Sequence, residues 1–358
     1  PLRKRGAIFL VPTSVHDAAR MSPEDIDKRL IQSPFRPPAW LRNRHAQTVL
    51  PSLPWAWRQR PELRREVLKL PDGDETAVDW VVATEDTPKT APLLVILHGL
   101  ESSAESAYAR MLMATATERQ WRCCVLHFRD CGDYRNLLPR RYHAGETNDV
   151  RFFINKLEAE GQYGPIGAAG YSLGGNVLLK YLGESADDCP LRGAAAVCVP
   201  FNLHVCAEAL NNGISKGYQR YLLKRMKKSV AGKFDPHTAA FDWQRAMRAE
   251  TFAEFDDAVT APLHGFSGKD DYYDKCSSVH FLKDIRRPTL IVNALDDPFM
   301  TPDVIPRPEQ LSEQVTLEVS DYGGHVGFIE GGTPWQPRFY LPGRLIGFLE
   351  PLAARPGL

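Results

Sequence analysis

The sequence lacks a net charge, a long apolar run and a paired-cysteine motif. Lysine plus arginine and aspartate plus glutamate each number 44 among the 358 residues, so a strongly electrostatic partner such as nucleic acid is not expected. The longest apolar runs, residues 92–97 and 194–201, are far shorter than the ~20 residues of a membrane-spanning helix. We therefore expect no nucleic-acid binding, no transmembrane segment, and substrate recognition that is mostly apolar and local.

Several kinds of site are also missing. The seven cysteines are odd in number and show no C-x-x-C spacing, which argues against a disulfide framework and a structural zinc site, and favours reduced thiols in a cytoplasmic protein. The Gly-rich run 167–175 matches neither the Walker spacing nor a dinucleotide fingerprint. Asp130 and Asp133 have no third ligand near them and are interpreted as turn residues. We expect no metal and no cofactor.

The first 62 residues are predicted to be an irregular arm that packs on a core, because prolines at 34, 37, 38, 51 and 54 interrupt any regular element. Its aromatic side chains need such a core to pack on: Phe35, Trp40, Trp55 and Trp57. The basic start of the chain precedes an apolar run that is too short for a signal peptide. Met21 is interpreted as a natural start, which makes residues 1–20 an upstream extension.

From residue 63 the sequence predicts a parallel α/β sheet. Residues 66–70 and 76–82 form an expected hairpin around an Asp-Gly turn. Short apolar runs at 93–97, 122–128, 166–170, 193–199, 288–293 and 315–319 then alternate with helix-like stretches, the last of them at 340–352. This alternation is typical of a mostly parallel, twisted sheet flanked by helices, with a core of residues 63–202 and 285–358.

The alternation stops between residues 203 and 284. A basic, helix-prone stretch from Ile214 to Met247 interleaves Lys and Arg with aromatic and aliphatic residues. Its position inside the sheet sequence favours a helical cap or lid, and a pair of ordinary solvated surface helices is the alternative. The basic stretch leaves open a peripheral contact with lipid surfaces.

The most informative motif is the run Gly170-Tyr171-Ser172-Leu173-Gly174, which lies between an apolar segment and a helix-like one. This G-x-S-x-G pattern is typical of a nucleophile elbow, in which the small residues two before and two after the serine allow the backbone to double back. A serine hydroxyl needs an imidazole to take its proton and an acid to orient that imidazole. Ser172 is therefore the candidate nucleophile.

The partners of Ser172 are expected later in the chain, in the order acid and then histidine. His325 lies in a Gly-rich loop after the run 315–319, and the acid lies after the run 288–293, where Asp296 and Asp297 are adjacent. The position of Phe299 two residues later favours Asp297, and Asp296 stays the alternative. Between the acid and His325 we expect one helix and one strand.

An ester passes through a tetrahedral oxyanion that two backbone N–H groups can stabilise. In this topology the donors are expected to be Leu173, which follows the nucleophile, and Leu100, in the loop after the strand 93–97. His98 at that strand end is interpreted as bracing the loop. His143 and His204 receive no role.

The motifs together resemble the YheT-like branch of the α/β-hydrolases. The resemblance rests on Leu41-Arg42-Asn43-Arg44-His45-Ala46-Gln47-Thr48 in the arm, and on residues 98–103, 128–132, 170–176, 255–257, 260–262, 265–266, 272–273, 293–298 and 323–327. It implies an α/β-hydrolase fold, and matches Ser172, one aspartate of the 296/297 pair and His325 to the charge-relay residues of the family. Members look like serine hydrolases of carboxylic esters, with relatives that act on short- to medium-chain esters, acylglycerols or phospholipids.

The sequence thus predicts a serine carboxylesterase or lipase that works through an acyl-enzyme and takes a small ester substrate. A thioesterase or amidase on the same residues is the enzymatic alternative. The non-enzymatic alternative is a binding protein that keeps the fold but has no catalytic activity.

Overall fold

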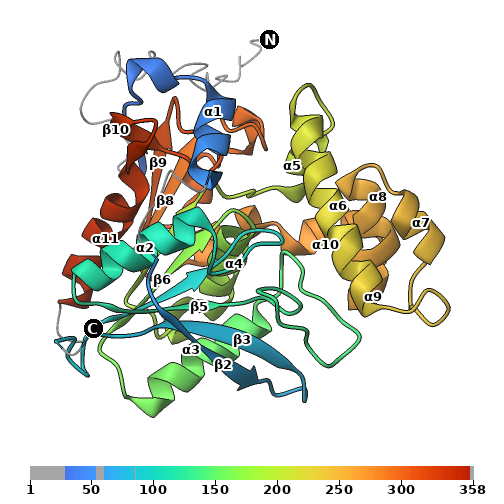
Figure 1. Ribbon diagram of the computed structural model, residues 1–358, viewed down its shortest axis with the longest axis horizontal. Helices are drawn as coiled ribbons and strands as arrows, with labels where there is room; N and C mark the ends of the chain where they lie inside the picture. The colour runs from blue at the N-terminus through green and yellow to red at the C-terminus, as the bar shows by residue number, and fades with distance from the viewer. Residues whose placement is uncertain (1–28, 54–59, 85, 355–358) are drawn as a thin grey trace, which may run out of the picture.

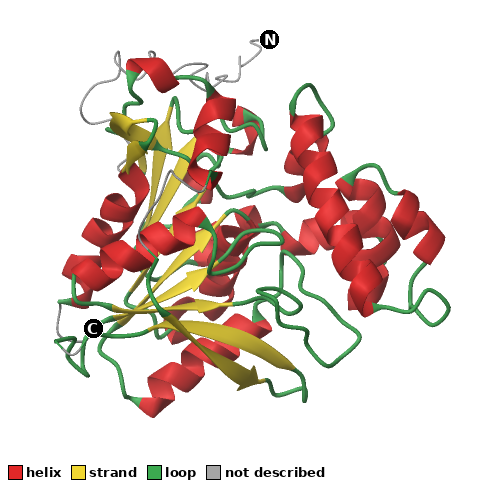
Figure 2. Ribbon diagram, viewed as in Figure 1, coloured by secondary structure: helices red, strands yellow, loops and turns green. Residues whose placement is uncertain are grey.

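The computed structural model describes residues 29–53, 60–84 and 86–354. The interpretations of Met21, of the basic start of the chain, and of Trp55 and Trp57 lie outside the described residues. A nine-stranded sheet runs through the molecule in the order β1-β9-β8-β7-β6-β4-β5-β3-β2 (Figures 1 and 2). Only the β2/β3 and β3/β5 pairs are antiparallel, so the predicted mostly parallel sheet with an antiparallel hairpin at one edge is confirmed.

The strands of this sheet are β1 (Leu30–Gln32), β2 (Leu63–Lys69), β3 (Glu75–Val81), β4 (Leu93–Leu97), β5 (Arg122–Leu126), β6 (Ile166–Tyr171), β7 (Gly193–Val197), β8 (Thr289–Ala294) and β9 (Val315–Ser320). A separate hairpin consists of β10 (Ile329–Thr333) and β11 (Gln336–Phe339). The helices are α1 (Arg44–Val49), α2 (Ala107–Glu118), α3 (Asn148–Glu160), α4 (Leu173–Ser185), α5 (Leu203–Ala209), α6 (Ser215–Lys233), α7 (Trp243–Arg248), α8 (Phe252–Phe255), α9 (Ala261–His264), α10 (Lys269–Cys276) and α11 (Tyr340–Ala353).

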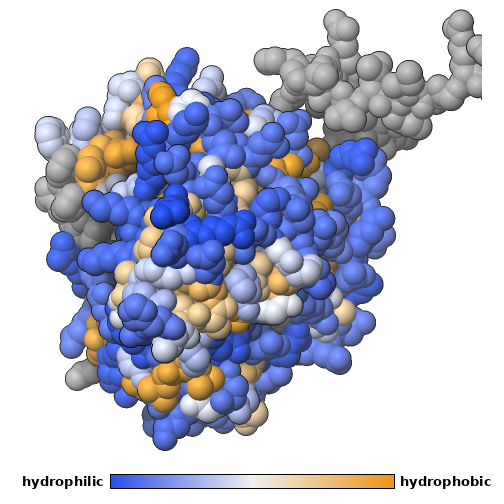
Figure 3. Space-filling view, turned by 90° about the vertical axis from the view of Figure 1, so that its right-hand side faces the viewer, coloured by the Kyte–Doolittle hydropathy of each residue, from blue (hydrophilic) through white to orange (hydrophobic). Residues whose placement is uncertain are grey.

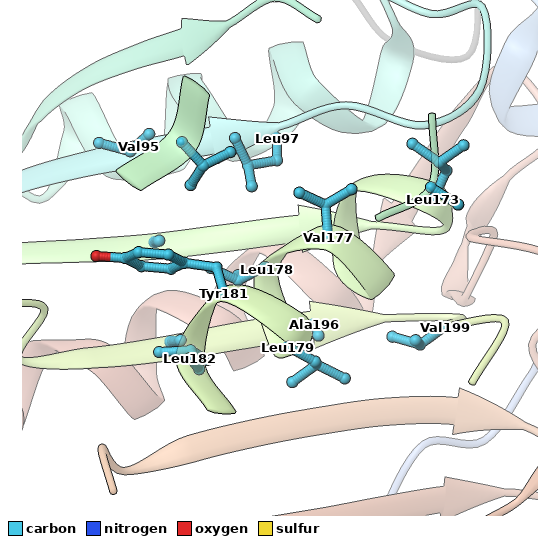
Figure 4. Close-up of a cluster of buried hydrophobic side chains, with 14 of the residues drawn as sticks. Val95, Leu97, Leu173, Val177, Leu178, Leu179, Tyr181, Leu182, Ala196 and Val199 are labelled. Carbon is cyan, nitrogen blue, oxygen red and sulfur yellow. The ribbon is translucent and has the colours of Figure 1, made fainter. Parts of the chain in front are cut away.

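The central strands are apolar throughout because helices cover both faces of the sheet. Along β4, Val95 packs into the cluster that includes residues of α3 and α4, and its neighbour Ile96 packs into the cluster that includes residues of α2 and α11. Figure 4 shows the first of these clusters, where Val177 and Tyr181 of α4 lie over the sheet. These two packed layers fix the carboxyl end of β6, from which Ser172 follows.

The N-terminal segment is more regular than the sequence suggested. Leu30–Gln32 pairs in parallel with β9 and extends the sheet at its edge, and a strand of three residues is too short to show a periodic pattern. Phe35 is buried and lies 5.0 Å from Phe328 between ring centroids, as expected for an arm that packs on the core. Trp40 differs, since 47% of it is exposed.

Six helices, α5 to α10, separate β7 from β8, where the sequence predicted a cap. We call residues 203–284 the insertion. The insertion has a hydrophobic cluster of its own, built around Leu223, Met226 and Phe255, and its helices lie to the right of the sheet in Figure 1. The basic, helix-prone stretch forms two helices, α6 and α7.

The segment between Asp297 and His325 contains the expected strand, β9, but no α-helix. Prolines at 298, 302, 306 and 308 limit regular structure there to two 3₁₀ turns, Pro302–Val304 and Pro308–Gln310. The hairpin β10–β11 follows the histidine loop and was not expected from the sequence.

In the described part of the chain, no helix combines the length and the apolar content needed to cross a membrane.

Candidate active site

Ser172 lies in the tight turn between β6 and α4. Its backbone has φ 52° and ψ −119°, a conformation that a non-glycine residue adopts only when the surrounding structure holds it. The turn directs the hydroxyl out of the sheet at the carboxyl end of a central strand, where ligands bind in open α/β folds. Ser172 therefore occupies the strained elbow that the motif predicted.

Gly170 and Gly174 make this turn possible. A Cβ on Gly170 would lie 2.5 Å from the carbonyl oxygen of Gly174, and one on Gly174 would lie 2.4 Å from that of His98. Both obstacles are backbone atoms, which cannot move aside without disturbing the sheet. The expectation that the residues two before and two after the serine must be small is confirmed.

His325 lies between Ser172 and an aspartate. Its Nε2 atom is 3.0 Å from Ser172 Oγ, and its Nδ1 atom is 2.8 Å from Asp297 Oδ2. The ring stacks on that of Phe299, with centroids 4.0 Å apart. The structure thus brings together three of the residues singled out from the sequence, from loops after three different strands.

The two adjacent aspartates have different partners. Asp297 is 1% exposed, and its second oxygen accepts the backbone N–H of Phe299 at 2.8 Å. Asp296 Oδ1 accepts the N–H of Gly324 at 2.9 Å, and its Oδ2 atom has no hydrogen-bond partner among the described residues. Asp297 is therefore the aspartate that contacts His325, and Asp296 holds the histidine loop from behind.

Burial raises the pKa of Asp296 to about 6, so the folded state disfavours the ionised carboxylate. The free energy of unfolding therefore falls as the pH rises from about 4 to about 6, and stays lowered above that range. Asp296→Asn keeps an oxygen for the Gly324 N–H and removes the charge. We expect Asp296→Asn to raise the free energy of unfolding by about 1 kcal/mol at neutral pH, a value that allows for the partial exposure of the side chain. At pH ~4 we expect no difference between the variant and wild type.

Urea unfolding of wild type and Asp296→Asn at the two pH values measures this difference. A variant that is equally stable or less stable than wild type at neutral pH would contradict the assignment of a half-buried Asp296 that is charged at that pH.

Helix α1 braces the histidine loop, which the sequence reasoning missed. Thr48 Oγ1 accepts the backbone N–H of His325 at 2.9 Å and donates to the carbonyl of Arg44. The fully buried amide of Gln47 donates to Leu41 O and Ile329 O and accepts the N–H of Ile329. The signal was present in the motif Leu41–Thr48, whose polar residues have no other evident task in an arm.

Two backbone N–H groups beside Ser172 have no protein acceptor among the described residues. Leu100 and Leu173 line the same cavity as Ser172 and His325, and within the described residues neither N–H donates to a protein acceptor. The neighbouring N–H groups of Gly99 and Glu101 are occupied by the hydroxyls of Tyr108 and Tyr142. The loop thus leaves the N–H of Leu100 as an available donor.

His98 braces this loop, as interpreted from the sequence. Its Nδ1 atom donates to Gly99 O at 2.7 Å and its Nε2 atom accepts the N–H of Phe128 at 3.1 Å. Burial, with the nearby His127, lowers the pKa of His98 to about 3, so the ring is neutral at physiological pH. Asp130 is likewise structural, since it binds Arg141 and Ser229.

The cavity above Ser172 has a volume of about 130 Å³. Its apolar wall comes largely from the insertion: Leu203, Ala207, Leu210, Leu222, Met226 and Phe252. Its polar wall includes Asp256 and the buried Glu101–Arg141 ion pair. The insertion therefore determines the shape of the space that a substrate would enter.

One histidine cluster beside the cavity has the residue types of a metal site. The ligand atoms of His143, Glu146 and His264 lie within 4.8 Å of one another. However, the guanidinium of Arg140 binds Glu146, and burial together with the charge of Arg140 lowers the pKa of both imidazoles to about 3. These surroundings oppose the binding of another cation.

Comparisons with known proteins identify the family to which this fold belongs. The profile of the α/β hydrolase fold family matches residues 92–332. The chain is 39% identical to the candidate esterase YheT of Escherichia coli (strain K12) over 344 residues, 92% of this chain and 97% of that protein. It is 29% identical over 317 residues to the phospholipase ABHD3 of Homo sapiens, 87% of this chain and 77% of the relative.

A monoacylglycerol lipase of Saccharomyces cerevisiae (strain ATCC 204508 / S288c) is 29% identical over 255 residues, 68% of this chain and 57% of that protein. The solved structure of the Pyrococcus furiosus esterase Pf2001 superposes with a TM-score of 0.56 at 14% identity, covering 83% of this chain and 94% of that one, which shows a shared fold. The chain belongs to the α/β-hydrolase family, within its YheT-like branch, and its homologues are esterase- and lipase-like hydrolases.

Proposed function

We propose that this protein is a serine hydrolase that cleaves carboxylic esters, of short- to medium-chain or lipid-like acids, through an acyl-enzyme. One observation carries the proposal: the chain of contacts from Ser172 Oγ to His325 and from His325 to the buried Asp297, at 3.0 and 2.8 Å. These are hydrogen-bond distances at which an imidazole can take the proton of a serine hydroxyl.

In the first half of the reaction, Ser172 Oγ attacks the ester carbonyl while His325 Nε2 takes its proton. Asp297 accepts the Nδ1–H of His325, which fixes the tautomer and stabilises the imidazolium that forms. The N–H groups of Leu100 and Leu173 donate to the oxyanion. His325 then returns the proton to the leaving alcohol, and an acyl group remains on Ser172.

In the second half, water replaces the alcohol. His325 takes a proton from the water as it attacks the acyl carbonyl, the same two N–H groups stabilise the second oxyanion, and the proton returns to Ser172. The acyl group fits the apolar wall that α5, α6 and α8 supply, because methylene groups leave water there without losing hydrogen bonds. We propose that residues 203–284 act as a cap that selects the acyl chain.

A series of p-nitrophenyl acyl esters tests the proposal. We expect release of p-nitrophenol, with kcat/KM rising with acyl length while the chain still fits against Leu222 and Met226, and falling once it does not. Matched thioesters and anilides separate an esterase from a thioesterase or an amidase. No turnover of any ester in the series would overturn the proposal.

Thr48 is expected to matter for activity although it does not contact the substrate. Thr48→Val keeps the shape of the side chain but leaves the His325 N–H without its acceptor. The histidine loop is then held less firmly, and the imidazole ring is less precisely placed between Ser172 and Asp297. We expect kcat for esters to fall about tenfold with KM little changed. Thr48→Ser, which keeps the hydroxyl, should restore the rate, and equal rates for the two variants would contradict this role.

A further inference from the structure

The cationic residues of the insertion are concentrated on one helix. Helix α6 contains seven lysines and arginines and no aspartate or glutamate in its 19 residues: Lys216, Arg220, Lys224, Arg225, Lys227, Lys228 and Lys233. The whole chain, in contrast, carries no net charge. Such segregation produces a local positive potential that the neutral total conceals.

Three of these cations have acceptors within the protein. Arg225 donates to the carbonyl of Glu101, Lys227 to that of Met247, and Lys233 to Asn136. The other four, Lys216, Arg220, Lys224 and Lys228, are exposed, and the structure shows no carboxylate paired with them in the described ranges. Unpaired, solvated cations in a row are available to an external anionic partner.

Three of these four side chains, together with Lys227, line a groove. It has a volume of about 540 Å³, and four of its lining residues are cations of α6: Lys216, Arg220, Lys224 and Lys227. Its one carboxylate is Glu250, and the rest of the lining is polar or small apart from Leu223. The groove is separate from the cavity at Ser172, with which it shares no residue.

The two faces of α6 serve different spaces. Leu222 and Met226 face the cavity above Ser172, and the four unpaired cations lie on the exposed side of the helix. Figure 3 views the molecule from the side of the insertion and shows a mainly hydrophilic face. Ile214 and Tyr221 are exceptions, with 68% and 59% of their surface exposed.

We propose that the outer face of α6 docks on the surface of an anionic phospholipid bilayer. Charge complementarity identifies the partner as anionic, and the combination of a basic helix face with an exposed aliphatic and an exposed aromatic residue is typical of helices that lie on a lipid surface. The helix is ~28 Å long at 1.5 Å per residue, so it contacts several headgroups at once. The substrate cavity then lies behind the docked helix.

The inference goes beyond the proposed function, because docking does not require that the protein hydrolyse anything. Each cation beside an anionic surface contributes roughly a fivefold increase in partition coefficient. Binding through α6 is therefore expected to depend on several charges together, and to weaken strongly as salt screens them.

Sedimentation with vesicles tests the proposal. Wild-type protein is mixed with sucrose-loaded vesicles of pure phosphatidylglycerol or pure phosphatidylcholine, at low and at high salt. The test variant carries K216E, R220E, K224E and K228E. A control variant carries the same change in charge at exposed positions outside the insertion, R64E, K69E, K89E and R286E.

We expect wild type and the control variant to sediment with phosphatidylglycerol at low salt, and the α6 variant to partition at least about 100-fold more weakly. Circular dichroism and turnover of a water-soluble ester check that both variants are folded. No binding by wild type, equal binding by the α6 variant, or equal binding to phosphatidylcholine would overturn the proposal. So would duplex DNA that displaces the protein from vesicles, since the partner would then be a nucleic acid.

Discussion

Ser172→Ala is expected to reduce kcat for ester hydrolysis by roughly 10⁴- to 10⁶-fold. The change removes the single atom that attacks the carbonyl, and neither His325 nor the two backbone N–H groups can replace it. Alanine tolerates the positive φ of this position about as well as serine does, so the turn and α4 should be unchanged. Discontinuous assays with p-nitrophenyl esters at high enzyme concentration, sampled over long times, measure the residual rate.

A control for Ser172→Ala comes from binding. Because the cavity walls stay intact, the variant should still bind a non-hydrolysable ketone analogue of the ester, with its cooperative thermal unfolding preserved. Near-wild-type turnover by the alanine variant would end the serine-hydrolase account, and would leave the fold with either another nucleophile or no chemistry at this site.

Asp297→Asn is expected to lower kcat by roughly 10³- to 10⁴-fold. Asp297 accepts from Phe299 N with one oxygen and faces His325 Nδ1 with the other. An asparagine amide in this place can present its NH₂ group to the ring, which favours the tautomer with the proton on Nε2. That tautomer cannot take the proton of Ser172.

The neighbouring Asp296→Asn is the matched control for Asp297→Asn. It changes the same chemical group one residue away, but Asp296 contacts the backbone of Gly324 and not the imidazole. We expect kcat to stay within a few-fold of wild type. A large loss in Asp296→Asn together with a small one in Asp297→Asn would reverse the roles of the two carboxylates.

The fold and much of the site follow from local features of the sequence. Fully apolar runs such as Leu93–Leu97 identify buried parallel strands, and a serine between Gly170 and Gly174 identifies the elbow, because backbone geometry demands small residues there. The order of the acid and the histidine along the chain follows from the topology of the sheet. These signals lie within a few residues of the positions that they describe.

Features that depend on distant contacts were harder to predict. Strand β1 exists because β9 offers an edge to pair with, and the role of Thr48 depends on a loop 277 residues later. The choice between Asp296 and Asp297 depends on which side chain points to the histidine at the end of the strand. The position of Phe299 two residues later favoured Asp297 but could not decide between the two. The alternation of helix and strand after Asp297 suggested a helix that four prolines prevent.

The most direct test of the account is where a fluorophosphonate reagent reacts. Such a reagent forms a covalent bond with a serine only when a base has activated its hydroxyl and an oxyanion site receives the phosphoryl oxygen. Tryptic mass spectrometry of the treated protein should show one adduct, on Ser172, that His325→Ala abolishes. An unmodified Ser172 in folded protein, or an adduct that forms equally well without His325, would contradict it.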